Sequence, residues 1–384
     1  MEEQTKNPNH LLEVISLSVA FGEKSPATVK GISFYIEKGE TVALVGESGS
    51  GKSVSAMSIL QLLPYPYAHH PSGEITFKEQ PMMGAPHKTL ESLRGGSIGT
   101  IFQEPMTSLN PLMTIENQIA ETLVIHQGLK GRVLSDRVLE LLNLVGIKDP
   151  QNRLKSYPHQ MSGGQRQRVM IAMAIANNPD LLIADEPTTA LDVTIQKQIL
   201  ELLQELQQKL GMGLLLITHD LGVVRNMADR VYVMQQGEIV ESGDCETIFD
   251  KPKHPYTKKL LAAEPHGTVK PIESNVKTVL KASNIKVEFD ITHGIFNRSK
   301  GTLTAVDKIS IDIAEGETLG VVGESGSGKS TLGKAILRLQ QAGGDIIFDA
   351  KTLHDKNLSQ MRELRKEIQV VFQDPFGSLS PRSK

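Results

Sequence analysis

The chain has 384 residues, and its 41 basic and 44 acidic side chains leave a formal net charge of −3 at pH 7. This length predicts roughly two to three domains, and the charge argues against a nucleic-acid binder that works by bulk attraction. A single cysteine, Cys245, excludes an internal disulfide framework and a multi-cysteine metal site, and it fits a reducing compartment.

The chain begins without a basic segment followed by an apolar stretch, so the sequence predicts no signal peptide. Its apolar runs are shorter than the roughly 18 residues that indicate a membrane-spanning helix. We therefore expect a soluble, cytoplasmic protein.

Hydrophobic periodicity predicts strands and helices in alternation. In chain order, the expected elements are strands over 12–20, 32–36 and 41–45, a helix over 53–63, a helix over 165–176, a strand over 181–184, a helix over 194–210 and a strand over 214–218. This alternation predicts an α/β fold with a largely parallel sheet. The hairpin-like opening of the chain predicts a small antiparallel subdomain beside it.

An internal repeat divides the chain. The segment from Gly39 to Ser53 recurs from Gly316 to Ser330, and the block around Gln103 recurs around Gln373. Two blocks in the same order predict a duplicated domain. We expect a first copy over 10–265, a linker over 266–278 and a second copy over 279–384. The second copy ends soon after its glutamine block, so we expect it to be incomplete.

The first repeated segment carries a P-loop between an apolar strand and a helix, and the second copy repeats this arrangement. The residues of the first loop are Gly46, Glu47, Ser48, Gly49, Ser50, Gly51, Lys52 and Ser53, followed by Val54. The second copy offers Gly323, Gly326, Gly328, Lys329, Ser330 and Thr331. Backbone N–H groups of such a loop wrap a phosphate, which a Cβ would obstruct. Lys52 can reach the β- and γ-phosphates, and the Ser53 hydroxyl can bind Mg²⁺. A glycine-rich turn is the structural alternative.

Two carboxylates follow the predicted strand over 181–184. Asp185 is placed to hold Mg²⁺ through water, and Glu186 is placed to polarise the attacking water as a general base. The alternative is an acidic pair that only ends a strand and starts a loop.

A second motif opens the next predicted helix. Ser162 is a natural N-cap, and Gly163, Gly164 and Gln165 follow it, so the start of the helix is an anion-binding site. One nucleotide needs no second such site in one domain, whereas two facing domains can each close on the γ-phosphate of the other. The alternative is an ordinary capped helix.

Together these motifs resemble those of ABC-type ATPases, in the same order along the chain. The resemblance implies a P-loop NTPase fold with an antiparallel β subdomain and a helical subdomain, followed by an incomplete second copy. It implies binding and hydrolysis of ATP with Mg²⁺, and a sandwich with another ABC ATPase domain. By the same resemblance Gln103 senses the γ-phosphate, contacts the membrane subunit and joins Ser53 and Asp185 at the metal. Ser330 and Gln373 are the matching metal residues of the second copy.

Further roles come from the same resemblance. Lys52 and Glu186 act in hydrolysis, His219 touches the γ-phosphate, and Asp192 lies at the dimer seam. Phe21 resembles the aromatic residue that stacks on adenine, although an aromatic residue in a strand is as often part of the core.

Other features resemble one branch of this family. The sequence His254-Pro255-Tyr256 resembles the C-terminal element of ATPases that serve dipeptide, oligopeptide and nickel importers, with a surface turn as the alternative. Two fused copies resemble the double ATPases of glutathione-type and microcin C-type peptide importers. This resemblance implies two transmembrane permease subunits, a periplasmic or extracellular solute-binding protein, and a peripheral position on the cytoplasmic face of the inner membrane.

Two other classes of function compete. A soluble ABC ATPase acting on ribosomes or DNA is disfavoured because Lys52 and Ser162 are only 110 residues apart and the linker is short, so we expect no nucleic-acid partner. A regulatory module that no longer hydrolyses ATP is disfavoured, for the first copy, by Glu186 and His219. Since no signature follows the second P-loop, we expect neither composite site to be complete within one molecule.

Overall fold

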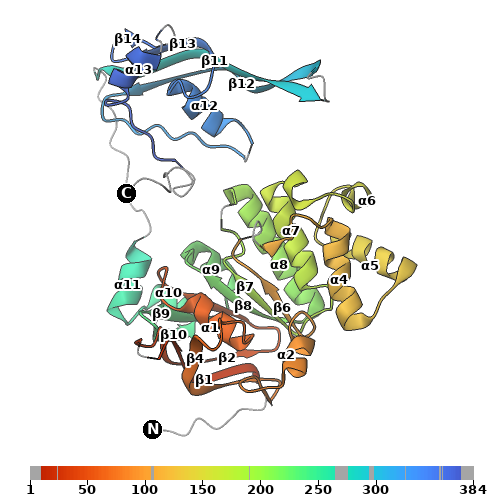
Figure 1. Ribbon diagram of the computed structural model, residues 1–384. Coiled ribbons are helices and arrows are strands. Elements are labelled where there is room, and N and C mark those ends of the chain that lie inside the picture. Colours follow the sequence, from red (N-terminus) through yellow and green to blue (C-terminus); the bar gives the residue numbers. More distant parts are fainter. Residues whose placement is uncertain are drawn as a thin grey trace. The chain divides into compact units, whose positions relative to one another are not determined.

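Figure 1 shows the computed structural model, which describes residues 10–23, 25–104, 108–189, 191–263, 276–293, 298–324, 326–353, 356 and 358–372. The chain divides into two compact units, Met1–His266 and Gly267–Lys384. Each unit is described by itself below.

The first unit alternates strands with helices along most of its length. Its strands are β1 (His10–Phe21), β2 (Val29–Glu37), β3 (Thr41–Val45), β4 (Ala68–Phe77), β5 (Gln80–Pro81), β6 (Ile98–Ile101), β7 (Leu181–Asp185), β8 (Gly213–Thr218), β9 (Arg230–Gln235) and β10 (Glu238–Asp244). Its helices are α1 (Lys52–Ile59), α2 (His87–Leu93), α4 (Ile115–Gln127), α5 (Gly131–Leu144), α6 (Pro150–Arg153), the 3-10 turn η1 (Pro158–Gln160), α7 (Gly163–Ala174), α8 (Val193–Leu210), α9 (Leu221–Met227), α10 (Cys245–Asp250) and α11 (Pro255–Ala262).

The predicted elements are present, with shifts of one to four residues at most ends. The largest shift is in α1, which ends at Ile59 although the sequence predicted helix to residue 63. Gln61 has a φ of 51°, outside the helical region, and Pro64 disfavours helical backbone at the residue before it. The helix therefore stops before the apolar pattern does.

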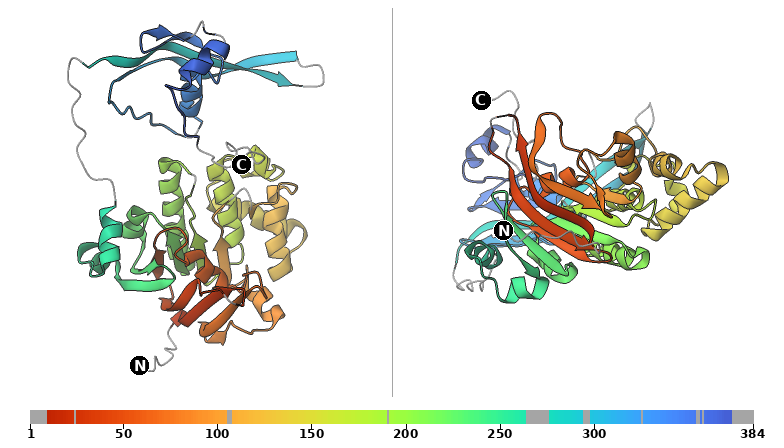
Figure 2. Two further views of the ribbon diagram at one scale, coloured as in Figure 1. Left: turned by 60° about the vertical axis from the view of Figure 1, so that its left-hand side comes forward. Right: turned by 90° about the horizontal axis from the view of Figure 1, so that it is seen from below.

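Two sheets organise the first unit. The six-stranded sheet has the order β10-β9-β3-β8-β7-β6, in which only β10 runs antiparallel to its neighbour. The four-stranded sheet β2-β1-β4-β5 is antiparallel throughout. The predictions of a largely parallel sheet and of an antiparallel subdomain are therefore confirmed. Figure 2 shows the red strands of the antiparallel sheet lying over the green strands of the six-stranded sheet.

Strand β3 lies between two parts of the core. Val42 and Leu44 belong to the cluster that contains α1 and the antiparallel sheet, whereas Ala43 and Val45 belong to the cluster with α9, α10 and α11. This alternation follows from the two-residue period of a strand. Both faces of β3 are thus covered, and the loop that follows it begins from a rigid position.

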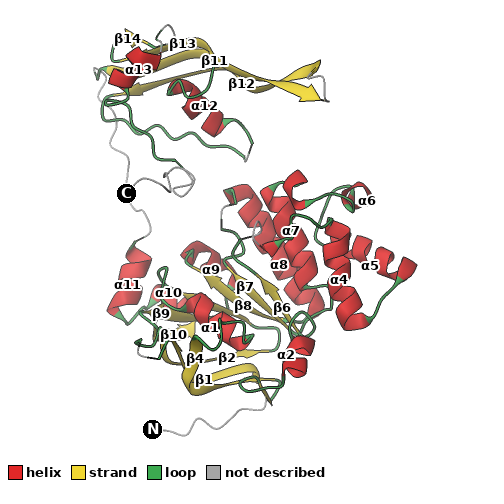
Figure 3. Ribbon diagram, viewed as in Figure 1, coloured by secondary structure: helices red, strands yellow, loops and turns green. Residues whose placement is uncertain are grey.

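Helices gather at one end of the first unit, as Figure 3 shows for α4 to α8. Buried residues of α4, α5, α7 and α8 pack in one cluster with Leu182 of β7 and Leu216 of β8. The helical subdomain predicted by the resemblance is therefore present.

The second unit repeats the antiparallel sheet of the first. Its elements are β11 (Thr278–His293), β12 (Arg298–Ala314), α12 (Lys329–Ile336), β13 (Gly343–Phe348), β14 (Lys351–Thr352) and α13 (Leu358–Leu364). The order β12-β11-β13-β14 corresponds to β2-β1-β4-β5, with the same antiparallel pairing. Leu280, Ile285 and Val287 of β11 pack on Leu332 and Ala335 of α12.

The sequence also predicted a strand before the second P-loop, and this prediction was wrong. Residues 317–324 have no regular secondary structure, and Val322 is 91% exposed, whereas Val45 in β3 is 1% exposed. Strand β3 is hydrogen-bonded to β8 on one side and β9 on the other. The described residues of the second unit provide no strand in either position, and an isolated apolar segment cannot satisfy its backbone polar groups by itself. Gln373 and the residues after it lie outside the described part of the chain.

Candidate nucleotide site

The P-loop of the first unit connects β3 to α1 and wraps around its own lysine. Lys52 is 5% exposed, and its Nζ donates to the carbonyl oxygens of Gly46 at 2.7 Å and Glu47 at 2.9 Å. Gly46 has a φ of +150°, and a Cβ there would lie 2.2 Å from the carbonyl oxygen of Met234. Only glycine fits this position, which lets the start of the loop pass close to the backbone of β9.

Burial lowers the pKa of Lys52, while the carboxylates of Glu186 and Asp185 act in the opposite direction. The lysine thus sits in a poorly hydrated position with two negative charges nearby. A buried cation at a loop of backbone N–H groups is a suitable place for phosphate oxygens.

Asp185 at the end of β7 contacts Ser53 in the first turn of α1. Asp185 is the last residue of β7 and is buried, and the Ser53 Oγ donates to its Oδ1 at 3.1 Å. Burial raises the pKa of Asp185. The hydrogen bond from Ser53 opposes this effect, and the net direction is upward. A hydroxyl and a carboxylate are the hard oxygen ligands that Mg²⁺ prefers, alongside substrate phosphates and water, so these residues fit that ion. Among the described residues, no group of three or more His, Cys, Asp or Glu side chains forms a metal site by itself.

Glu186 lies at the centre of a second set of contacts. Its carboxylate accepts from Gln103 Nε2 at 3.0 Å and Thr189 Oγ1 at 2.8 Å, and it lies 3.1 Å from His219 Nδ1. Gln103 follows β6, Glu186 follows β7, and His219 follows β8. Because parallel strands β6, β7 and β8 are neighbours, their carboxyl ends meet at one edge of the sheet.

The backbone and charge state of Glu186 are both constrained. Its φ is 47°, an uncommon value for a residue other than glycine, and its N–H donates to the Ile217 carbonyl at 2.8 Å. Burial by itself raises the pKa of Glu186, but hydrogen bonds from Thr189, His219 and Gln103 lower it, and the net direction is downward. Glu186 is therefore a carboxylate at neutral pH.

The Ser162 motif starts α7 and makes its own set of contacts. Ser162 caps α7, and its side chain and that of Gln165 form reciprocal bonds with backbone N–H groups at 3.3 and 3.0 Å. A Cβ on Gly164 would lie 2.7 Å from Ile195 of α8, and Gly163 lies beside Leu191. Asp192 caps α8 by accepting from Ile195 N at 3.1 Å. In the described part of the unit, no hydrogen bond joins these residues to the P-loop.

Two other predicted residues are partly in the core. Phe21 ends β1, packs against the cluster of the antiparallel sheet, and lies 6.0 Å from the ring of Tyr67 in a tilted arrangement. Val54 also packs against this cluster, so its backbone is the part that can meet a phosphate.

Sequence reasoning missed two residues that touch the site. Thr189 holds Glu186, and the only signal for it was a hydroxyl three residues after the carboxylate. The Tyr256 hydroxyl accepts the backbone N–H of Glu47 at 3.1 Å, although 209 residues separate the two positions. No local pattern predicts this second contact.

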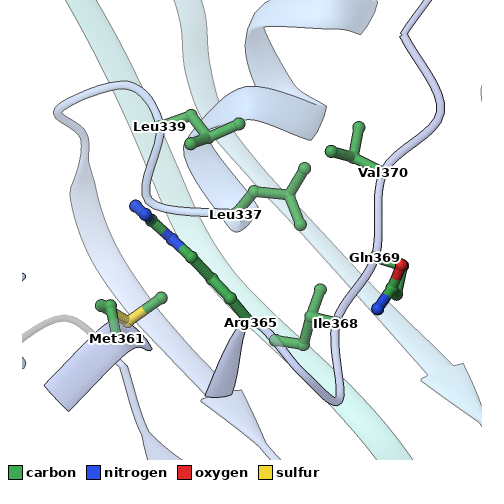
Figure 4. Close-up of a pocket in the computed structure, with 7 residues that line it drawn as sticks. All are labelled: Leu337, Leu339, Met361, Arg365, Ile368, Gln369 and Val370. Carbon is green, nitrogen blue, oxygen red and sulfur yellow. The ribbon is translucent and has the colours of Figure 1, made fainter. Parts of the chain in front are cut away.

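The second P-loop has the same internal bonds. Lys329 Nζ donates to the carbonyls of Gly323 and Glu324, both at 2.6 Å, and Gly328 precedes α12 with a φ of +92°. This unit also has a cavity of about 220 Å³. Figure 4 shows residues that line it, among them Leu337, Met361 and Ile368. It lies beyond the C-terminal end of α12, whereas the P-loop precedes that helix, so it is not a phosphate site.

The model of the family described as "ABC transporter" matches residues 29–189 and 306–384. The chain belongs to the ABC transporter family. A second model, "Oligopeptide/dipeptide transporter, C-terminal region", matches residues 240–284. The chain is thus an ABC ATP-binding protein of the oligopeptide/dipeptide type, in a family that hydrolyses ATP. None of its described helices is long and apolar enough to cross a bilayer.

Curated relatives agree with this assignment. The "Peptidoglycan transport ATP-binding protein YejF" of Agrobacterium fabrum is 55% identical over 384 residues, which cover 100% of this chain and 70% of the relative. The "Uncharacterized ABC transporter ATP-binding protein YejF" of Escherichia coli is 51% identical, with 97% and 71% covered. The "Glutathione import ATP-binding protein GsiA" of Pectobacterium atrosepticum is 43% identical, with 97% of this chain and 65% of the relative covered.

Solved structures of ABC cassettes share the fold. CbiO1 of Clostridium perfringens, part of the ABC transporter complex cbiONQ, matches with a TM-score of 0.56 and 30% identity, covering 63% of this chain and 92% of that one. The cassette MJ0796, in a dimeric post-hydrolysis state bound to ADP and Pi, matches with a TM-score of 0.55 and 30% identity, covering 61% of this chain and 98% of that one. The predicted fold class is confirmed.

Proposed function

We propose that the chain is the ATP-hydrolysing subunit of an importer for peptides or peptide-like solutes. The convergence of Lys52, Ser53, Asp185, Glu186 and His219 at one edge of the six-stranded sheet carries this proposal. The relatives named for peptidoglycan transport and glutathione import, and the match to the oligopeptide/dipeptide element, support the class of solute.

Each residue of the first site has a separate task in this proposal. The P-loop N–H groups and Lys52 bind the phosphates, while Ser53, Asp185 and Gln103 would hold Mg²⁺, which neutralises phosphate charge when bound. Glu186 accepts the proton of the attacking water. Gln103, Thr189 and His219 hold its carboxylate in one orientation. Phe21 supports the adenine ring from the end of β1.

A second cassette completes each site. The Ser162 motif starts α7, Ser162 is exposed, and among the described residues no hydrogen bond joins the motif to the P-loop. We assign Ser162, Gly163, Gly164 and Gln165 to the γ-phosphate of a facing cassette, with Asp192 at the seam. The dimeric state named for MJ0796 supports this pairing. The repeated P-loop, with Lys329, Ser330, Thr331 and Gln373, belongs to a second ATPase copy fused in the same chain.

The remaining partners are membrane proteins. We propose that the chain docks from the cytoplasmic side on two permease subunits, which receive the solute from a periplasmic or extracellular binding protein. This function is tested by measuring whether association of the chain with the membrane depends on the permeases. The full chain is expressed with and without its permease pair, and membranes are separated from ribosomes by sedimentation. We expect the chain in the membrane fraction only with the permeases. Sedimentation with ribosomes in both cases would instead favour a soluble ABC ATPase of translation.

A further inference from the structure

The C-terminal element of the first unit reaches back to the P-loop through Tyr256. This residue lies in the first turn of α11, is 6% exposed, and packs in the cluster of Ala43, Val45, Val231 and Val233. Its ring is therefore held against β3 and β9, the strands that flank the start of the loop. From this position its hydroxyl accepts the Glu47 N–H at 3.1 Å.

The peptide group that Tyr256 binds also holds the lysine. The Glu47 N–H and the Gly46 carbonyl belong to the same peptide plane, and that carbonyl accepts from Lys52 Nζ at 2.7 Å. The plane is bonded at both ends, to Tyr256 on one side and to Lys52 on the other. Rotation of the plane would break both bonds together. Hydrogen bonds in such a chain also polarise one another.

Three backbone bonds hold Tyr256 in place. The Glu241 carboxylate on β10 accepts the N–H groups of Lys253 at 2.7 Å and His254 at 3.0 Å. His254 Nδ1 then accepts the N–H of Tyr256 at 3.2 Å and caps α11, in which Pro255 takes the first position. The sequence His254-Pro255-Tyr256 thus has one task for each residue: a cap, a helix start, and a contact with the P-loop.

We propose that Tyr256 is a positioning residue for nucleotide binding, which acts on Lys52 through the Gly46–Glu47 peptide. A displacement of α11 would then move the Gly46–Glu47 peptide of the first P-loop and change its hydrogen bond to Lys52. This inference rests on the proposed function, in which that loop binds ATP. In the described part of the second unit no hydroxyl accepts the Glu324 N–H, although Lys329 makes the same two bonds to its loop.

Tyr256→Phe in the full chain tests the proposal, because it removes the hydroxyl and keeps the ring. Loss of this one half-buried hydrogen bond from the loop should weaken binding by about 5- to 10-fold. We expect this loss in the affinity for a fluorescent ATP analogue, together with faster deuterium exchange of the Glu47 amide. Tyr232→Phe is the matched control, since Tyr232 is also buried on β9 and its ring lies beside that of Phe34 on β2. It should leave the affinity unchanged.

A double-mutant cycle separates positioning from a general effect on the fold. If Tyr256 acts through Lys52, Tyr256→Phe should change affinity less than about twofold when Lys52 is already alanine. The same 5- to 10-fold loss in both backgrounds, or unchanged exchange at Glu47, would overturn the inference. If the Lys52→Ala chain binds the analogue as tightly as wild type, the proposed nucleotide site itself is wrong. If only Tyr256→Phe binds like wild type, the site stands and the inference fails.

Discussion

Residues 46–53 and 323–330 have the same eight-residue sequence, yet they lie in different surroundings. Inside the loops the two copies agree: Gly46 and Gly323 have φ values of 150° and 154°, and each lysine donates to the same two carbonyls. Outside the loops they differ, since Val45 is buried in β3 and Val322 is 91% exposed. The conformation of the loop is thus a local property, whereas the strand before it depends on neighbouring strands.

The same contrast explains the cavity in the second unit. Ile368, which lines it, corresponds in the repeat to Ile98 of β6, a fully buried residue. In the first unit Ile98 packs with Leu181 and Ile183 of β7 in one cluster. Without a strand in that position among the described residues of the second unit, the matching apolar side chains line an open space.

The largest expected effect concerns Glu186, because it is the general base of the proposed reaction. The described part of the second unit has no carboxylate that could replace it. Glu186→Gln keeps the shape of the side chain and removes its charge, so turnover should fall about 100-fold or more. Affinity for ATP should change little, and an ATP-bound sandwich should accumulate. Phosphate release is measured at matched protein concentrations, with Glu205→Gln on the exposed face of α8 as the control. Unchanged turnover where wild type is active would contradict the role of Glu186.

The two P-loop lysines should differ in their effect on binding. Lys52→Ala removes charged hydrogen bonds and should weaken a fluorescent ATP analogue by roughly 10- to 100-fold. Lys329→Ala is the matched variant on the same loop sequence and should cause a smaller loss, because that lysine is less buried and its loop lacks the surrounding sheet. Titration of both variants measures the difference. Equal losses would show that the loop acts independently of its surroundings.

Stability should distinguish the two segments that precede the loops. Val45→Ala removes two buried methyl groups and should lower the free energy of unfolding of the first unit by about 2 kcal/mol. Val322→Ala should have an effect within about 0.5 kcal/mol, since that side chain is exposed. Calorimetry of the full chain, with the transition of each unit followed separately, provides the measurement. A comparable loss from both variants would show that residues 318–322 are packed in solution.

The smallest expected effect is the pH dependence of the Glu241 contact that holds α11. Burial raises the pKa of Glu241, but the hydrogen bonds from the backbone N–H groups of Lys253 and His254 lower it, and the net direction is below its ordinary value of 4.5. A carboxyl whose pKa is lower in the folded state stabilises that state above about pH 4.5 and loses this contribution as the pH falls through the folded value. Titration of Glu241 by NMR should therefore give a value below 4.5. A value at or above 4.5 would show that the Glu241 carboxylate does not accept the hydrogen bonds that hold Tyr256 in place.

Most of the first site could be predicted from the sequence because its residues lie at the ends of local elements. Lys52 and Ser53 start a helix, Asp185 and Glu186 end a strand, and His219 follows another. The general rule that parallel strands present their carboxyl ends at one edge then brings them together. Thr189 and Tyr256 could not be found in this way, since neither belongs to a pattern with a phosphate function.

The sequence by itself determined the predicted strands and helices of the first unit, the conformation of both P-loops and the family to which the chain belongs. These depend on short-range periodicity, on glycines at positive φ, and on motifs in a fixed order. Only the tertiary structure decided that 318–322, which the repeat matches to 41–45, is not a strand, because a strand requires hydrogen-bonding neighbours from distant parts of the chain. It also decided that Tyr256 meets Glu47, because the packing of α11 on β3 and β9, and no local preference, brings these residues together.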